Sequence, residues 1–269
     1  MASKPTLIFC PGAWYPTTAF EPLVAHFPDH STYTVAFPSI QQATSVQDLQ
    51  PDIDALRTLV EQEANAGKDV VVISHSWSGL PVNSALDGLS KTERQAAGET
   101  GGVAKLIFIS AFIPEIGESL IGAFGGVPPD WYDRDVSQLY NYLSLPISSL
   151  LGSPSHPRLQ EANGTVSAVD PYSLFFHDVP DGEQWAQTLR PHAWATKNSP
   201  ATSAAYTRIP SVYLQCENDR AIPLFVQQLM VEKARGKGAQ MTTEIIATGH
   251  SPWLVDPTPV ADFVQRSLA

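Results

Sequence analysis

Cysteines and long apolar runs are both scarce in this sequence, and each shortage excludes a class of protein. The chain has two cysteines, Cys10 and Cys216, near the ends of apolar strand-like runs, where cysteine is usually a small buried side chain. We therefore expect neither a disulfide nor a metal site. The first apolar run, Thr6 to Cys10, is too short for a signal peptide or a membrane span. This predicts a cytoplasmic protein.

Basic residues are also in short supply, with 16 lysines and arginines against 27 aspartates and glutamates and a net charge of −11. Binding to nucleic-acid phosphates or anionic membranes needs clustered basic residues, so we expect neither partner. A length of 269 residues suits one large domain or two small ones. Nothing marks a flexible linker, which favours a single domain over 1–269, and a homodimer is compatible with the sequence.

Short apolar runs alternate with helical patterns along the chain. In one helical segment, Leu49, Ile53, Leu56 and Val60 are spaced four, three and four residues apart, which places them on one face of a helix. Six runs are typical of buried strands: Thr6–Cys10, Thr32–Phe37, Asp69–Ser74, Lys105–Ser110, Ser211–Cys216 and Thr242–Ala247. This alternation predicts an α/β protein with a doubly wound, mainly parallel sheet.

The stretch 114–205 breaks that rhythm, because it lacks a clear buried strand and is rich in proline, glycine and aromatic residues. We interpret it as a cap insertion over the active site, with the core formed by 1–113 and 206–269. Packing alone is the alternative. Its aromatic residues are Trp131, Tyr132, Tyr140, Tyr142, Tyr172, Phe175, Phe176, Trp185 and Trp194. The residues expected to contact substrate are Trp14, Trp131, Tyr132, Phe176 and Trp185.

The segment Ser74-His75-Ser76-Trp77-Ser78-Gly79 follows a strand and opens a helix, which is the setting of a nucleophile elbow. Such a turn is so tight that the residues two before and two after the nucleophile must be small. Only Ser76 meets this condition, since Ser74 and Ser78 then occupy those positions. An ordinary turn is the alternative.

A serine nucleophile needs a base that is itself oriented by a carboxylate. His250 is the candidate base, because it follows a late strand in Thr248-Gly249-His250-Ser251-Pro252 and so lies at the same sheet edge as the elbow. Asp219 is preferred to Glu217 as the acid, although a helix-capping role for Asp219 is the alternative. Serine, aspartate and histidine then occur along the chain in the order that accompanies a nucleophile elbow.

The negative charge of a tetrahedral intermediate needs preorganised donors. The first strand ends in Pro11-Gly12-Ala13-Trp14, and Gly12 allows the close backbone approach that such donors require. We expect the backbone N–H groups of Ala13 and Trp77 to form the oxyanion hole.

These segments together resemble the plant methylesterase and hydroxynitrile-lyase branch of the α/β-hydrolase superfamily and its microbial esterase-like relatives. The four ordered motifs are Pro11-Gly12-Ala13-Trp14, the segment around Ser76, Cys216-Glu217-Asn218-Asp219 with Ala221-Ile222-Pro223, and Gly249-His250-Ser251-Pro252. The resemblance implies an eight-stranded sheet with a helical cap and no metal or organic cofactor.

Several chemistries share this fold. Hydrolysis of a small apolar ester or lactone is the first hypothesis, carbon–carbon lyase chemistry the second, and a ligand receptor with a weakly active triad the third. In the related lyases a lysine follows the histidine, whereas this chain has Ser251, so only a cap lysine such as Lys197 remains to supply that charge.

Overall fold

The computed structural model describes residues 4–134 and 164–268, and its central feature is a six-stranded sheet. The strand order is β2-β1-β3-β4-β8-β9, and each neighbouring pair is parallel. The strands are β1 (Thr6–Cys10), β2 (Thr32–Thr34), β3 (Asp69–His75), β4 (Gly102–Ile109), β8 (Ser211–Cys216) and β9 (Met241–Ile246). The predicted α/β fold class is confirmed.

The expected number of eight strands is wrong for the described residues, where the main sheet has six. Each of the six strands overlaps one of the six apolar runs of the sequence. The four inner strands bury most of their side chains between two helical layers, whereas the edge strands β2 and β9 are partly exposed. The two additional strands came only from the family resemblance, and no apolar run in the sequence supported them.

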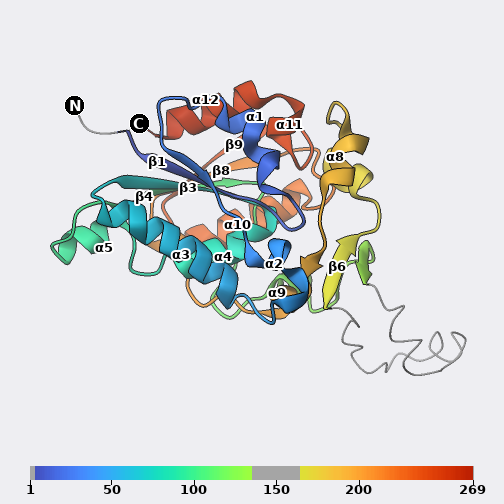
Figure 1. Ribbon diagram of the computed structural model, residues 1–269, viewed down its shortest axis with the longest axis horizontal. Coiled ribbons are helices and arrows are strands. Elements are labelled where there is room, and N and C mark those ends of the chain that lie inside the picture. The colour runs from blue at the N-terminus through green and yellow to red at the C-terminus, as the bar shows by residue number, and fades with distance from the viewer. Residues whose placement is uncertain (1–3, 135–163, 269) are drawn as a thin grey trace, which may run out of the picture.

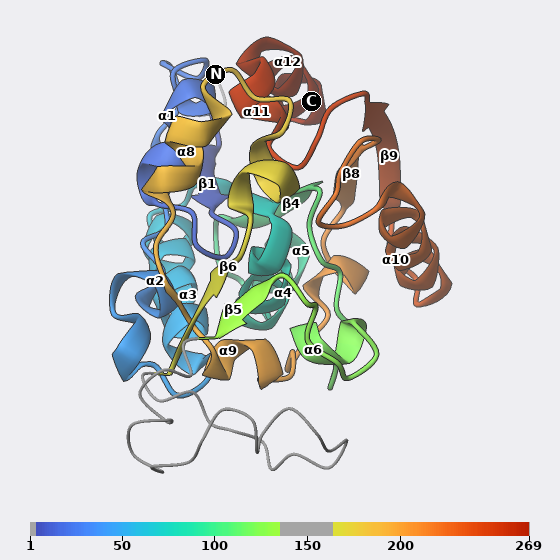
Figure 2. The same ribbon diagram turned by 90° about the vertical axis from the view of Figure 1, so that its right-hand side faces the viewer.

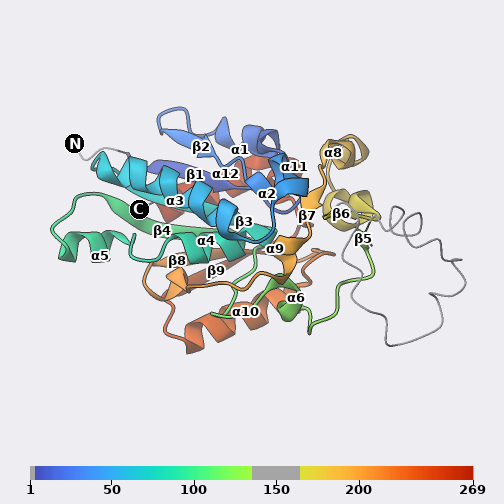
Figure 3. The same ribbon diagram turned by 60° about the horizontal axis from the view of Figure 1, so that its bottom comes forward.

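Helices cover both faces of the sheet (Figures 1 and 3). One face carries α3 (Gln50–Asn65), α4 (Gly79–Ala85) and α10 (Leu224–Gly236), and the other carries α1 (Glu21–Val24), α11 (Pro252–Val255) and α12 (Pro257–Ser267). Two short helices, α2 (Pro38–Gln41) and α5 (Lys91–Ala96), lie in the connections. The predicted apolar face of α3 is buried. No helix in the described ranges is long and apolar enough to cross a membrane.

The described residues between β4 and β8 form a separate layer at the carboxyl ends of the strands (Figures 1 and 2). It contains α6 (Leu120–Ala123), β5 (Tyr132–Arg134), β6 (Thr165–Ala168), a wide helical turn (Tyr172–Phe176), α8 (Gly182–Thr188), β7 (His192–Ala193) and α9 (Ala195–Asn198). We expected a helical cap, but this layer also contains a small antiparallel sheet formed by β5, β6 and β7. Tyr140 and Tyr142 lie outside the described residues.

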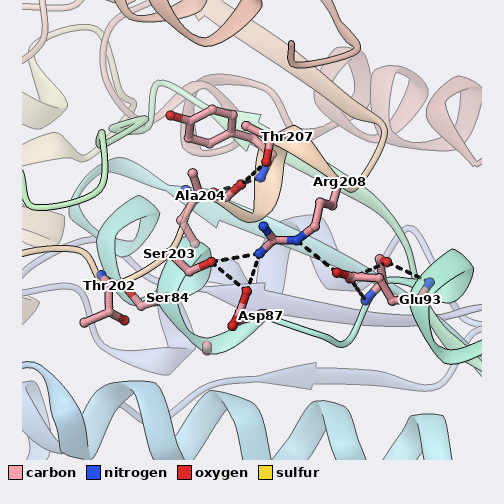
Figure 4. Close-up of polar contacts among 12 residues, drawn as sticks. Ser84, Asp87, Glu93, Thr202, Ser203, Ala204, Thr207 and Arg208 are labelled. Atoms are coloured by element: carbon pink, nitrogen blue, oxygen red, sulfur yellow. Dashed lines mark hydrogen bonds and ion pairs between the residues drawn. The ribbon is translucent and has the colours of Figure 1, made fainter. Parts of the chain in front are cut away.

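Polar contacts fix the point where the chain returns from this layer to the sheet (Figure 4). The turn Ala205–Thr207 is followed by Arg208, whose guanidinium pairs with Asp87 after α4 and lies 3.1 Å from Glu93 in α5. Ser203 donates a 3.0 Å hydrogen bond to the same Asp87. Exposed pairs contribute little individually, but here three polar groups converge on one site and hold the entry to β8.

Two glycines test how closely the backbone packs beside the sheet. A Cβ on Gly79 would lie 1.8 Å from the carbonyl oxygen of Phe112, whereas a Cβ on Gly236 in α10 would meet no atom within 4 Å. We expect Gly79→Ala to lower the free energy of unfolding by about 3 kcal/mol, and Gly236→Ala to raise it by about 0.5–1 kcal/mol. Urea unfolding of both variants measures this, and equal effects would contradict the close approach at Gly79.

Candidate active site

Ser76 follows β3 directly, in a turn with a strained backbone. Its φ angle is +55°, in the left-handed region that residues other than glycine rarely adopt. The hydroxyls of Ser74 and Ser78 lie 3.0 Å apart, and Ser78 Oγ accepts a 3.0 Å hydrogen bond from the N–H of His75. Larger side chains at these two positions would not fit, which is the physical basis of the small-residue pattern in the sequence.

The loops after β1 and β4 hold this turn in place. A Cβ on Gly12 would lie 2.9 Å from the Cβ of Ser76, so the first loop packs directly against the elbow. On the other side, the N–H of Ser76 donates to the carbonyl of Ser110 at 3.2 Å, and the N–H of Phe112 donates to the carbonyl of Ser76 at 3.0 Å. The nucleophile candidate is therefore fixed by both neighbouring strands of the sheet.

His250 and Asp219 form a buried pair at the same edge of the sheet. Nδ1 of His250 lies 2.7 Å from Oδ2 of Asp219, and the two residues are 0% and 6% exposed. The other carboxylate oxygen of Asp219, Oδ1, accepts hydrogen bonds of 2.8 and 2.9 Å from the N–H groups of Ala221 and Ile222. Glu217 is exposed, so the geometry favours Asp219 of the two sequence candidates.

Ser110, at the end of β4, connects these groups and was missed by the sequence interpretation. Its hydroxyl donates a hydrogen bond to Oδ2 of Asp219 and lies 3.3 Å from Nδ1 of His250. Its carbonyl oxygen accepts the hydrogen bond from the N–H of Ser76. Its φ of +41° again indicates a tight turn at a strand end. The only signal in the sequence was a serine that closes an apolar run, which we counted as the last residue of the strand.

The second imidazole nitrogen of His250, Nε2, is buried and has no hydrogen-bond partner in the part of the chain that the structure describes. Ser76 Oγ is therefore not hydrogen-bonded to it in this conformation. Catalytic hydrogen bonds are often long before substrate binds and shorten in the complex. The open acceptor position on His250 is compatible with proton transfer from the serine.

His75 lies between the elbow and the histidine loop. Its Nε2 is 3.0 Å from the carbonyl oxygen of His250, and the two imidazole centroids are 4.6 Å apart. Burial lowers the pKa of His75 well below its ordinary value, and the nearby His250 acts in the same direction. A neutral His75 thus supports the backbone of the His250 loop.

The two residues expected to supply the oxyanion donors, Ala13 and Trp77, line the cavity that also contains Ser76. Within the described residues, the N–H of Ala13 makes no hydrogen bond to a backbone or side-chain acceptor. Trp77 is the second residue of the helical turn Ser76–Ser78, where backbone N–H groups have no acceptor inside the helix.

The cavity over Ser76 has a volume of about 10 Å³ and walls made almost entirely of apolar side chains. Phe176 and Trp185 are not among its lining residues; Phe176 packs against Tyr15 at 5.5 Å, and Trp185 packs against the core from α8. Phe175, adjacent to Phe176 in the wide turn, takes that place in the wall. Three of the five expected contact residues line the cavity: Trp14, Trp131 and Tyr132.

Trp14 joins the core to the cap. Its indole Nε1 donates a 2.7 Å hydrogen bond to the carbonyl of Val166 in β6, and its ring stacks on Phe175 with centroids 5.6 Å apart. Trp131 and Tyr132 pack edge-on against the same indole. Trp14 thus contacts three other aromatic side chains that line the cavity, Trp131, Tyr132 and Phe175.

A parallel sheet wound with helices on both faces, with a serine on a strained strand-to-helix turn beside a buried histidine–carboxylate pair, is the architecture of an α/β hydrolase. The chain belongs to the alpha/beta hydrolase family, whose family model matches residues 7–263.

Individual relatives agree with this assignment. The chain is 28% identical over 274 residues to "Alpha/beta hydrolase nvfD" of Aspergillus novofumigatus (strain IBT 16806), covering 98% of this chain and 96% of that protein. It is 22% identical to Methylesterase 1 of Arabidopsis thaliana, covering 96% and 92%. The crystal structure of polyneuridine aldehyde esterase superposes with a TM-score of 0.68 at 16% identity, covering 99% and 100%. The predicted resemblance to the plant methylesterase branch is confirmed.

A buried polar cluster lies next to the site and was not predicted. Lys197 in α9 is 0% exposed, and its Nζ lies 4.7 Å from the ring centroid of Trp14 and 5.2 Å from that of Trp77. Nζ has no hydrogen-bond partner among the described residues. Burial lowers the pKa of Lys197 well below its ordinary value, and the carboxylate of Asp52 opposes that shift. In Asp52 itself, burial raises the pKa to about 6 against hydrogen bonds from Ser39.

The raised pKa of Asp52 makes stability depend on pH. Since it rises from 3.8 to about 6 on folding, the folded protein binds more protons between these values, and its free energy of unfolding falls as pH rises through this window. A shift of this size corresponds to about 3 kcal/mol. We expect Asp52→Asn to remove this component in urea unfolding from pH 4 to 7. Asp54→Asn, at an exposed position of the same helix, should leave the wild-type pH dependence intact; identical profiles for both variants would exclude Asp52 as the source.

Proposed function

We propose that this protein hydrolyses a small apolar carboxylic ester or lactone through an acyl-enzyme on Ser76. The observation that carries the proposal is the buried hydrogen bond between His250 and Asp219, which leaves Nε2 of the histidine without a partner beside the elbow. A buried carboxylate on Nδ1 fixes the tautomer in which Nε2 accepts a proton. The apolar cavity over Ser76 supports an uncharged substrate.

In the proposed reaction, Ser76 Oγ attacks the carbonyl carbon while its proton passes to Nε2 of His250. The carbonyl oxygen becomes negative and accepts hydrogen bonds from the N–H groups of Ala13 and Trp77. The carbon–oxygen bond to the alcohol then breaks, and His250 returns the proton to the departing oxygen. A water molecule then attacks the carbonyl carbon of the acyl-enzyme while His250 accepts its proton. The bond to Ser76 Oγ breaks, the proton returns to Oγ, and the acid is released. In a lactone the alcohol stays attached to the acyl group.

The positions of two residues favour hydrolysis over carbon–carbon lyase chemistry. Ser251, which follows the histidine, is engaged in a 2.7 Å hydrogen bond with the hydroxyl of Tyr15. Lys197, the cap lysine considered as a substitute charge, does not line the cavity over Ser76 and lies against the indoles of Trp14 and Trp77. No lysine side chain lines that cavity in the described structure.

Removing the proposed nucleophile tests the function most directly. We expect Ser76→Ala to lower kcat by roughly 10⁴-fold or more and to abolish covalent labelling by a phosphonate probe, with folding retained. Ser84→Ala, on the helix that follows, serves as a control that keeps activity and labelling. Peptide mapping of the labelled enzyme, together with ester, lactone and cyanohydrin panels, decides the outcome. Labelling at Ser74 or Ser78, or cyanide release without ester or lactone turnover, would refute the proposal.

The carboxylate assignment has its own test. The proposed base works only if a carboxylate orients it and keeps Nε2 available for the serine proton. Asp219→Asn should lower kcat by roughly 10³- to 10⁴-fold through loss of histidine orientation, whereas Glu217→Gln should be mild because Glu217 is exposed. Steady-state kinetics across pH for both variants gives the answer, and the reverse order of effects would place the acid two residues earlier.

A further inference from the structure

The cavity over Ser76 is too small to hold a substrate by itself. A volume of about 10 Å³ accommodates at most one water molecule, whereas small-molecule sites typically enclose about 300–1,000 Å³. The atoms attached to a reacting carbonyl must therefore occupy space that adjoins this cavity.

A second, larger cavity of about 120 Å³ lies alongside it, lined by residues of α6, α10 and the loops that precede them. Phe112, Phe124, Ala221 and Ile222 line both cavities, so the two spaces are separated by one shared wall. We call the second cavity the α6–α10 groove. Its remaining lining residues are Ile113, Glu118, Ala123, Pro223, Val226, Leu229, Met230 and Lys233.

The groove is apolar along most of its length. The face that α10 contributes carries Val226, Leu229 and Met230 before Lys233, and only Glu118 and Lys233 among the lining residues are charged. The Lys233 side chain is 50% exposed, so its charge is hydrated by solvent. An apolar wall of this kind stabilises a bound hydrocarbon chain by about 0.8 kcal/mol per buried methylene and offers few groups that could fix a polar ligand.

The shared wall has one fixed side and one that can move. The backbone of Phe112 is held by its hydrogen bond to Ser76 and by the contact with Gly79. Phe124 follows the four-residue helix α6, is only partly buried, and meets the ring of Phe112 edge-on with centroids 5.6 Å apart. Phe124 is therefore the side chain of the shared wall whose rotation would connect the groove with the cavity over Ser76.

We propose that the α6–α10 groove is the binding site for an extended apolar chain of the substrate, with the reacting carbonyl at Ser76 and the chain passing between Phe112 and Phe124. This rests on the proposed hydrolase function and narrows the substrate class to esters or lactones with a linear apolar chain. The apolar chain of the substrate belongs to either the acyl or the alcohol part of the ester. Two homologous series of esters distinguish these two possibilities.

The experiment compares Met230→Trp, which fills the groove, with Phe225→Trp, which adds a similar bulk on the same helix outside it. Phe225 is 69% exposed and does not line the groove. kcat/KM is measured for p-nitrophenyl esters from acetate to decanoate, and for n-alkyl acetates of the same chain lengths. In wild type we expect kcat/KM in one series to rise about fourfold per methylene until the groove is full. Met230→Trp should lower the ratio of kcat/KM for the eight-carbon chain to kcat/KM for the two-carbon chain in that series more than tenfold, and Phe225→Trp should preserve this ratio.

The proposal is overturned if Met230→Trp leaves the chain-length profile unchanged, or if it lowers activity on all chain lengths by the same factor. Failure of the hydrolase assignment gives a different result, since wild type then turns over no ester or lactone at all. In that case calorimetric titration with n-alkanols still tests the groove. Affinity must rise with chain length in wild type and in Phe225→Trp, and lose that dependence in Met230→Trp.

Discussion

The left-handed backbone at Ser76 is the constraint on which the rest of the site depends. Such a conformation costs about 1–3 kcal/mol and persists only where the surroundings enforce it. Here two glycines from different segments permit that enforcement: Gly12 lets the first loop contact the elbow, and Gly79 lets the backbone of Phe112 approach from the opposite side. With both contacts in place, Ser76 lies in the wall of the apolar cavity together with Ala13 and Trp77.

The parts of the site that the sequence predicted are those encoded within a few residues of a strand end. Ser76, Asp219 and His250 each follow an apolar run, and parallel strands bring their carboxyl ends to one edge without further information. Ser110 lies at an equivalent position, but nothing local shows that its hydroxyl contacts Asp219. That contact depends on the placement of β4 beside β8, which becomes visible only once the sheet order is known.

The segment between β4 and β8 interrupts the alternation of strands and helices in the sequence, but its construction could not be predicted. Its strands have three, four and two residues, too few for an alternating pattern to emerge from the sequence. The wide turn at Tyr172–Phe176 rotates successive side chains differently from an α-helix, so Phe175 and not Phe176 lines the cavity. Trp131 and Tyr132, two of the expected contact residues, line the cavity over Ser76 and pack on Trp14 of the first loop.

Lys197 shows where sequence reasoning reaches its limit, because a lone lysine in a polar segment is normally expected in solvent. Its burial is tolerated through the indole faces of Trp14 and Trp77, which attract a cation, and through the carboxylate of Asp52. The same two indoles also line the cavity over Ser76, whereas Lys197 does not. The aromatic rings thus give the cavity an apolar wall while covering a polar cluster behind it. A lysine in contact with the reacting atoms would stabilise a departing anion. Because these rings separate Lys197 from the cavity, the hydrolysis proposed above relies on backbone N–H groups as donors to the carbonyl oxygen.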